Sequence, residues 1–199
     1  MSASSARGNR NSWTANHPIS AIAGMSAFDP LRTLANVGHL RLLPPQPRKA
    51  LIAVIGCIAV VTSFILVLDG VVFRSSLQLG YVRFFTQPLF PRMPLLMVLA
   101  VTDEMKFRLV LMSVLFVLIA AWRGKVAFGW AIAAIVLSQF VNSAAAVLDD
   151  PLYSILRYWA VGCVWGWLYW RHGWLAAVIG HAATHLVLDP ALLIVLSGL

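Results

Sequence analysis

Apolar residues in this chain form long continuous stretches and do not alternate regularly with polar ones. Five stretches approach or exceed the roughly 20 residues that cross a bilayer as a helix. They cover approximately residues 50–73, 94–122, 126–148, 152–170 and 174–198. The pattern therefore predicts an all-α protein, a polytopic transmembrane helical bundle with about five membrane-spanning helices.

The N-terminal region differs from the rest of the chain in composition. Residues 1–48 are rich in Ser, Asn and Arg and end in a Pro-rich link. They are predicted to form a cytoplasmic region, disordered over residues 1–18 and lying on the membrane surface as an amphipathic helix over residues 30–43. Residues 49–199 are predicted to form the transmembrane helical domain, in which residues 74–93 are an aromatic, mildly basic connection at the interface.

Composition and charge support the membrane assignment. Hydrophobic residues make up 60% of the chain and charged residues only 11%, whereas soluble domains carry about 25% charged residues. Six of the 15 Lys and Arg residues precede the first apolar stretch, and an excess of basic residues is typical of cytoplasmic segments. We therefore expect an integral protein of the plasma membrane with a cytoplasmic N-terminus. The net charge of +8 is not gathered into a basic stripe with interleaved aromatics, so nucleic acid is not an expected partner.

A cluster of ionisable residues interrupts the second apolar stretch. Asp103, Glu104, Lys106 and Arg108 lie within six consecutive positions near its middle, and Glu104 is the only glutamate in the chain. An ionisable side chain at the centre of a bilayer costs about 2.5–3.5 kcal/mol on insertion scales and usually faces the protein interior or a watery cavity. The cluster is therefore a candidate functional site, although Glu104 and Arg108, one turn apart, could also form a purely structural ion pair.

The last apolar stretch carries two histidines four residues apart. His181 and His185 share one face of the expected helix, and Asp189 continues that face one turn later. At a rise of about 1.5 Å per residue, Asp103 lies about 14 Å from the outer edge of its span. His181 lies about 11 Å from the inner edge of its own span. In a hydrocarbon core about 30 Å thick, these two depths differ by only a few ångströms. The acids and imidazoles are therefore predicted to meet near mid-membrane. There a carboxylate could act as a general base toward water and an imidazole could hydrogen-bond an oxyanion.

These residues and their order resemble the CPBP family, the membrane-embedded CAAX-processing and bacteriocin-processing proteases. The family's first motif, EExxxR, is similar to the run DEMKFR at residues 103–108, with Asp in place of the first Glu. Its last motif, HxxxN or HxxxD, follows a phrase similar to GWLYWRHGWL at residues 166–175, which leads here to His181 and His185. The resemblance covers about residues 94–188.

The resemblance implies a helical intramembrane endopeptidase of the CAAX type, which cleaves a membrane-associated peptide or protein. Asp103 would then activate water, with Glu104 as its partner and Arg108 as support. His181 and His185 would form the oxyanion side of the site.

The family's middle motif, FxxxH, is incomplete in this chain. The corresponding run is FVNSA at residues 140–144, which keeps Phe140 but has no histidine. Asn142 or Gln139 could supply a hydrogen bond there, but neither side chain is an acid or a base at neutral pH. Phe140 and Asn142 are therefore supporting candidates. The missing histidine and the shorter carboxylate of Asp103 together predict weakened activity, because displacements of about 1 Å can cost 100-fold in rate.

Two other functions are compatible with the same residues. A bundle that has lost the middle histidine could act as a non-catalytic membrane chaperone or immunity-type partner. His181 and His185 also have the spacing of the zinc ligands in HExxH. Ala182 stands where that motif has glutamate. Asp103 or Glu104 would therefore have to complete the metal site of a metalloprotease or transporter. The protease reading requires no cofactor, and its expected partners are a membrane-associated substrate and membrane lipid.

Overall fold

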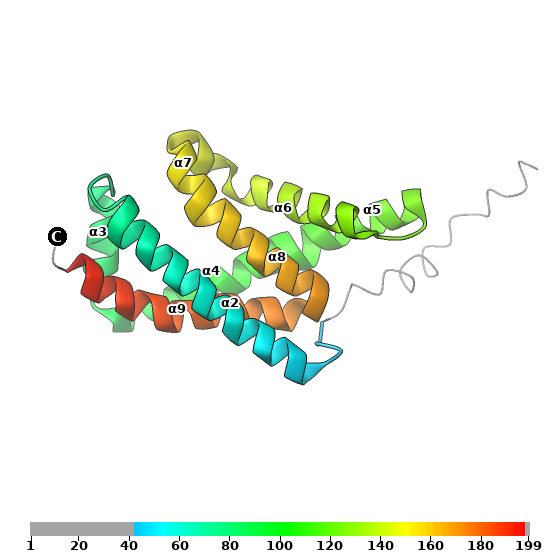
Figure 1. The fold of residues 1–199 in the computed structure, drawn as a ribbon, viewed down its shortest axis with the longest axis horizontal. Coiled ribbons are helices and arrows are strands. Elements are labelled where there is room, and N and C mark those ends of the chain that lie inside the picture. The colour runs from blue at the N-terminus through cyan, green and yellow to red at the C-terminus, as the bar shows by residue number, and fades with distance from the viewer. Residues whose placement is uncertain (1–41, 198–199) are drawn as a thin grey trace, which may run out of the picture.

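The structure, a computed structural model, describes residues 42–197, and within them the chain is built of helices joined by short connections (Figure 1). In chain order these are α2 (Pro47–Val67), η2 (Leu68–Val72), α3 (Leu79–Thr86), α4 (Leu89–Asp103), η3 (Glu104–Met112), α5 (Ser113–Arg123), α6 (Phe128–Asp149), α7 (Pro151–Ser154), η4 (Ile155–Ala160), α8 (Val161–His172) and α9 (Trp174–Leu196). The η segments are π-helical continuations of the α-helices beside them. The predictions for residues 1–18 and 30–41 lie outside the described residues.

Four of the described helices are long and apolar enough to cross a membrane, and they are Pro47–Val72, Leu89–Arg123, Phe128–Asp149 and Trp174–Leu196. The remaining predicted span corresponds to α7, η4 and α8, which together form a helix over residues 151–172. That helix is of similar length but less apolar, because its Trp, Tyr and Arg side chains lower the mean hydropathy. The predicted all-α transmembrane bundle is confirmed.

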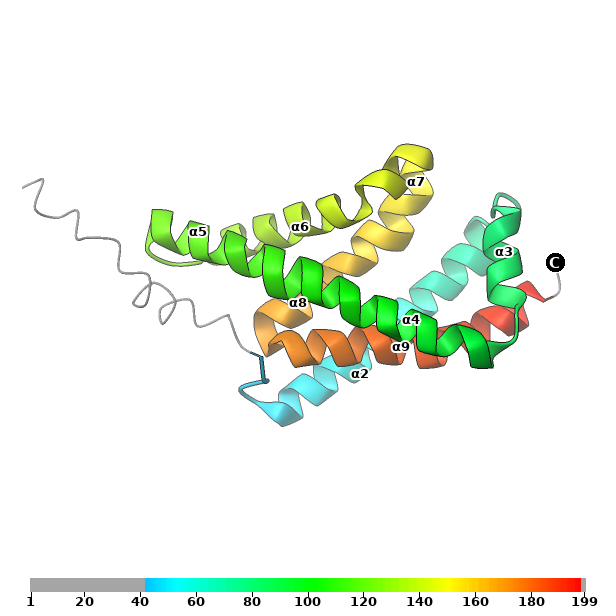
Figure 2. The same ribbon diagram turned by 180° about the vertical axis from the view of Figure 1, so that it is seen from behind.

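Helix α9 is the central element of the bundle. It packs most extensively against α2, α8 and α4, and Figure 2 shows α4 running beside it on the face opposite to α2. Its sequence is apolar nearly all the way round, as expected for a helix with neighbours on several sides. Ala177 and Leu192 of α9 are fully buried in the core, as is Leu168 of α8.

A single residue, Gly173, joins α8 to α9. Its φ of +92° lies in the region that favours glycine, and its N–H donates to the carbonyl oxygen of Tyr169 at 2.9 Å. The reversal lays α9 against α8 so closely that a Cβ added at Gly180 would lie 3.1 Å from the indole of Trp165. This turn brings the histidine-bearing part of α9 beside Trp165.

The three π-helical segments hold most of the buried charges. Asp69 lies in η2, Glu104 and Arg108 lie in η3, and Arg157 lies in η4, and all four are buried. Wide π turns are uncommon and often occur at functional sites. Here they coincide with the positions where charged side chains turn into the bundle.

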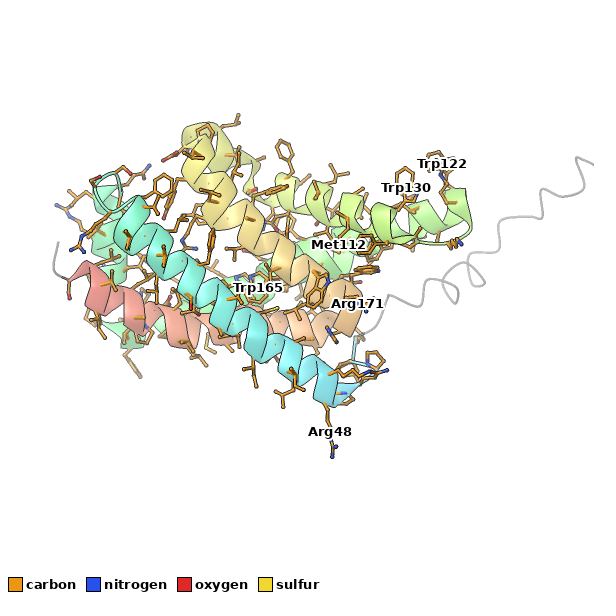
Figure 3. All side chains as sticks on the ribbon, viewed as in Figure 1. Arg48, Met112, Trp122, Trp130, Trp165 and Arg171 are labelled. Carbon is orange, nitrogen blue, oxygen red and sulfur yellow. The ribbon has the colours of Figure 1, made fainter. Side chains whose placement is uncertain are left out.

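Basic and aromatic residues gather at one end of the bundle. Arg48, Arg171, Trp122 and Trp130 all lie toward that end (Figure 3), and the guanidinium of Arg123 lies 3.9 Å from the Trp122 ring centroid. Such a combination is typical of a membrane–water interface. The assignment of this end to the cytoplasm stays a prediction.

Candidate active site

The two adjacent acids of the second long helix face different surroundings. Asp103 ends α4, is partly exposed and lines a cavity that is partly open to the outside. Glu104 begins η3 and is completely buried, with 0% exposure. Since consecutive helical residues point about 100° apart, the pair divides into one carboxylate at the cavity and one inside the protein.

Glu104 is held between a guanidinium and an imidazole. Its Oε2 lies 3.4 Å from Nε of Arg108, one turn later on the same helix. Its Oε1 lies 3.0 Å from Nδ1 of His181, which comes from α9. The predicted meeting of the acidic cluster with the histidine helix is therefore present in the structure, and it runs through Glu104.

Arg108 connects three helices in the interior. Its Nη2 donates to Oε1 of Gln139 on α6 and to the carbonyl oxygen of Gly162 on α8, each at 2.8 Å. The amide of Gln139 in turn donates to the carbonyl oxygen of Tyr158 at 3.3 Å. Because a buried guanidinium requires both a counter-charge and hydrogen-bond acceptors, this network fixes the position of Glu104.

The two histidines stack along one face of α9. The ring of His181 lies nearly parallel to the indole of Trp165, with centroids 5.6 Å apart, and 5.5 Å from the ring of His185. Nδ1 of His185 lies 3.3 Å from Oδ1 of Asp189, a buried residue one turn further along. Each imidazole therefore has Nδ1 against a carboxylate, as expected where a second group fixes the orientation of the ring.

The cavity beside these groups has a volume of about 490 Å³. Asp103, Arg108, His181 and His185 line it together with Asn142. Its remaining wall is largely apolar and aromatic and comes from α3, α4, α6, η4 and α8. It is large enough to admit water and part of a peptide beside the polar groups.

The two supporting candidates of the third span lie in different places. Asn142 lines the cavity, and its Nδ2 lies 3.5 Å from Oε1 of Gln139. Phe140, in contrast, is 53% exposed and is not among the residues that line the cavity. The supporting role expected of Phe140 stays a prediction. Ala144, where the family pattern has histidine, is also absent from the described cavity wall.

A second buried charge cluster was not anticipated. Nε of Arg157 lies 3.1 Å from Oδ2 of Asp69, and the hydroxyls of Tyr81 and Tyr153 both donate to the same carboxylate. The cluster ties the first long helix to α3 and to η4. Its signal was available in the sequence, since Asp69 and Arg157 are ionisable residues inside apolar stretches, the same criterion that singled out Glu104.

The arrangement bears on the zinc alternative. Within residues 42–197, no group of three or more His, Cys, Asp or Glu side chains is gathered as metal ligands. His181 and His185 lie against different carboxylates, Glu104 and Asp189.

Comparison with known proteins identifies a family for this chain. The family model described as "Type II CAAX prenyl endopeptidase Rce1-like" matches residues 85–187 of the 199. The chain belongs to this family. No curated protein and no solved structure matches it. The matched region contains the acidic run, the middle span and both histidines, and it ends just before Asp189. With its apolar helices, the family assignment makes the chain an integral membrane protein of the CAAX-protease type.

Proposed function

We propose that this protein is an intramembrane endopeptidase that hydrolyses a peptide bond near the C-terminal or membrane-proximal end of a membrane-associated substrate. One observation supports it most strongly, namely that Asp103, His181 and His185, from two helices, line the same cavity inside the apolar bundle. Family membership supports the class of reaction. The partners are then the substrate and the surrounding membrane lipid, and no cofactor is needed.

The chemistry follows from the positions of the acids. Asp103 faces the cavity and acts as the general base that takes a proton from water. His181, held through Nδ1 by Glu104, directs its other nitrogen toward the oxyanion that forms on the substrate carbonyl. Glu104 and Arg108 do not touch the substrate in this scheme, and they hold His181 in position.

Cleavage by purified protein in lipid vesicles tests the proposal. The substrates are fluorogenic lipidated peptides, with and without a prenyl group. Asp103→Asn, Glu104→Gln and His181→Ala should each lower kcat by about 100-fold or more, the range of general acid–base and oxyanion contributions. Asp149→Asn and His172→Asn are matched controls at residues outside the cavity, and both should cleave normally. Full activity in all three site variants would refute the mechanism.

A non-catalytic partner role is the second candidate, and the observation that favours it is the alanine at position 144 in place of the family's histidine. Under that function the wild-type protein would cleave no membrane peptide, and Asp103→Asn would leave its cellular phenotype unchanged. Bound zinc, measured by elemental analysis and lost with His181→Ala, would instead favour the metal alternative. The protease, the non-catalytic partner and the metal protein therefore predict different results in the cleavage and zinc measurements.

A further inference from the structure

Asp189 is a buried acid to which the proposed mechanism assigns no role. Its side chain is 0% exposed, and Oδ1 lies 3.3 Å from Nδ1 of His185. Its other oxygen, Oδ2, is also buried and has no hydrogen-bond partner among residues 42–197. A carboxylate in such surroundings is strongly destabilised unless a positive charge or a proton neutralises it.

The surroundings of Glu104 and Asp189 differ in charge. Glu104 has the guanidinium of Arg108 as a permanent cation in addition to His181. For Asp189, the only ion-pair partner among residues 42–197 is His185. A proton on the imidazole, or shared with the carboxylate, would give Asp189 the counter-charge that Arg108 gives Glu104.

The proton held by this pair can reach the cavity. Nδ1 of His185 is occupied by Asp189, which leaves Nε2 as the only other ring nitrogen. The His185 side chain is 18% exposed and is part of the cavity wall. Its ring stacks on His181 with centroids 5.5 Å apart, so both imidazoles border the same space.

We propose that the Asp189–His185 pair supplies the proton that the leaving amine receives, with His185 as the catalytic donor and Asp189 as its positioning residue. This rests on the proposed function. As the water oxygen bonds to the carbonyl carbon, Asp103 takes one water proton. When the C–N bond breaks, its electron pair remains on nitrogen, which takes a proton from Nε2 of His185. Asp103 then returns its proton to the pair across the cavity.

The role compensates for the incomplete middle motif. The third span offers Asn142 and Gln139 near the cavity, and neither can donate a proton as an acid at neutral pH. His185 occupies the second position of the last motif, where the family pattern noted above has Asn or Asp. The proton donor that α6 lacks is therefore supplied by His185 of α9.

Several charged or titratable groups lie on the cavity wall that His185 lines or on helices near α9, and they enter any test of its protonation. The groups on the same cavity wall are His181 on its own helix, Asp103 on α4, Arg108 on η3, Tyr81 on α3, and Arg157 with Tyr158 on η4. Helix α2, packed along α9, adds Cys57, and η2 adds Asp69, which is already paired with Arg157.

Nitrogen NMR of histidine-labelled protein in lipid nanodiscs tests the proton without any substrate. His172→Asn and His185→Asn assign the resonances. At pH 7 the His185 nitrogens should show both sites protonated, and Asp189→Asn should remove one proton while leaving the His181 signals unchanged. A singly protonated His185 in the wild-type protein, unaffected by Asp189→Asn, would overturn the proposal. Melting curves confirm that the variants are folded.

Substrate leaving groups provide the second test. An amine must be protonated to leave, whereas a phenolate leaves readily without a proton. His185→Asn should therefore slow amide cleavage by about 100-fold or more but slow cleavage of the matching aryl ester by less than about tenfold. Asp103→Asn should slow both, because both need activated water.

The outcomes separate this inference from the proposed function. An equal loss on amide and ester in His185→Asn would refute the donor role while leaving the protease assignment intact. Absence of cleavage of either substrate by the wild-type protein would overturn the protease assignment and the donor role together. In that case the nitrogen resonances still report whether the Asp189–His185 pair holds the proton.

Discussion

Replacing Gly162 with alanine should disrupt the active-site network without altering any charged or catalytic residue. A Cβ at this position would overlap the side-chain amide of Gln139. That amide accepts the hydrogen bond from Arg108, which also donates to the carbonyl oxygen of Gly162 itself. The added methyl therefore forces Gln139 away from Arg108.

The size of the effect follows from two terms. Overpacking a well-packed interior costs about 1–3 kcal/mol, and a lost hydrogen bond to a charged group costs about 1.5–3 kcal/mol. Gly162→Ala should therefore lower the free energy of unfolding by about 2.5–6 kcal/mol. In Gly162→Ala/Gln139→Ala the overlap disappears, while Arg108 still lacks the side-chain acceptor of Gln139. The double variant should therefore be more stable than Gly162→Ala alone.

Two other glycines provide matched controls. At Gly166, one turn later on the same helix, a Cβ would lie 2.8 Å from Cγ2 of Ile135, an apolar contact without a hydrogen bond. Its substitution should cost less than that of Gly162. At Gly129 a Cβ meets nothing within 4 Å in the part of the chain that the structure describes, so Gly129→Ala should change stability by no more than about 0.5 kcal/mol.

Reversible unfolding in mixed micelles, followed by tryptophan fluorescence, measures these differences. The same preparations are assayed for peptide cleavage, which Gly162→Ala should reduce because Arg108 no longer holds Glu104. If Gly162→Ala were as stable and as active as Gly129→Ala, the Arg108–Gln139 contact would not support the site, and the reasoning would be refuted.

Two further predictions concern other parts of the bundle. Asp69→Asn leaves Arg157 as a buried cation without its counter-charge and should lower the free energy of unfolding by about 3–5 kcal/mol. Asp149 is exposed, so Asp149→Asn should leave stability unchanged. Identical unfolding curves of the two variants in micelles would contradict this prediction. Tyr169→Phe removes the 2.7 Å hydrogen bond between the Tyr169 and Ser113 hydroxyls. It should lower the free energy of unfolding by only about 0.6 kcal/mol, the average for such bonds between membrane helices. A melting-temperature shift as large as that of Asp69→Asn would contradict this and show another role for the hydroxyl.

The helices were predictable because their signal is local. A bilayer offers no hydrogen-bond partners, so any long apolar segment must satisfy its backbone internally and form a helix. The sequence thus places the long helices within a few residues of their positions. Helix α4 is the exception, since it begins at Leu89 and not near Pro94. Pro91 and Pro94 fall in its first two turns, where few backbone hydrogen bonds are lost.

The candidate site was predictable in part. The spacing of Asp103, Glu104 and Arg108, and the depth argument for His181, correctly indicated side chains from two helices in one region. The spacing could not show which acid faces the cavity. That depends on the rotation of the second helix about its axis, which packing and the π-helical segment η3 determine.

The sequence by itself determined that this chain is a helical membrane protein whose ionisable residues must turn inward, because charge in lipid is costly wherever the helices lie. Only the tertiary structure decided which charges meet. It joined Glu104 to His181, Asp69 to Arg157, and Arg108 to Gln139. Such pairs join residues far apart in the chain, and their formation depends on helix rotation and close approach at glycines, which no local pattern encodes.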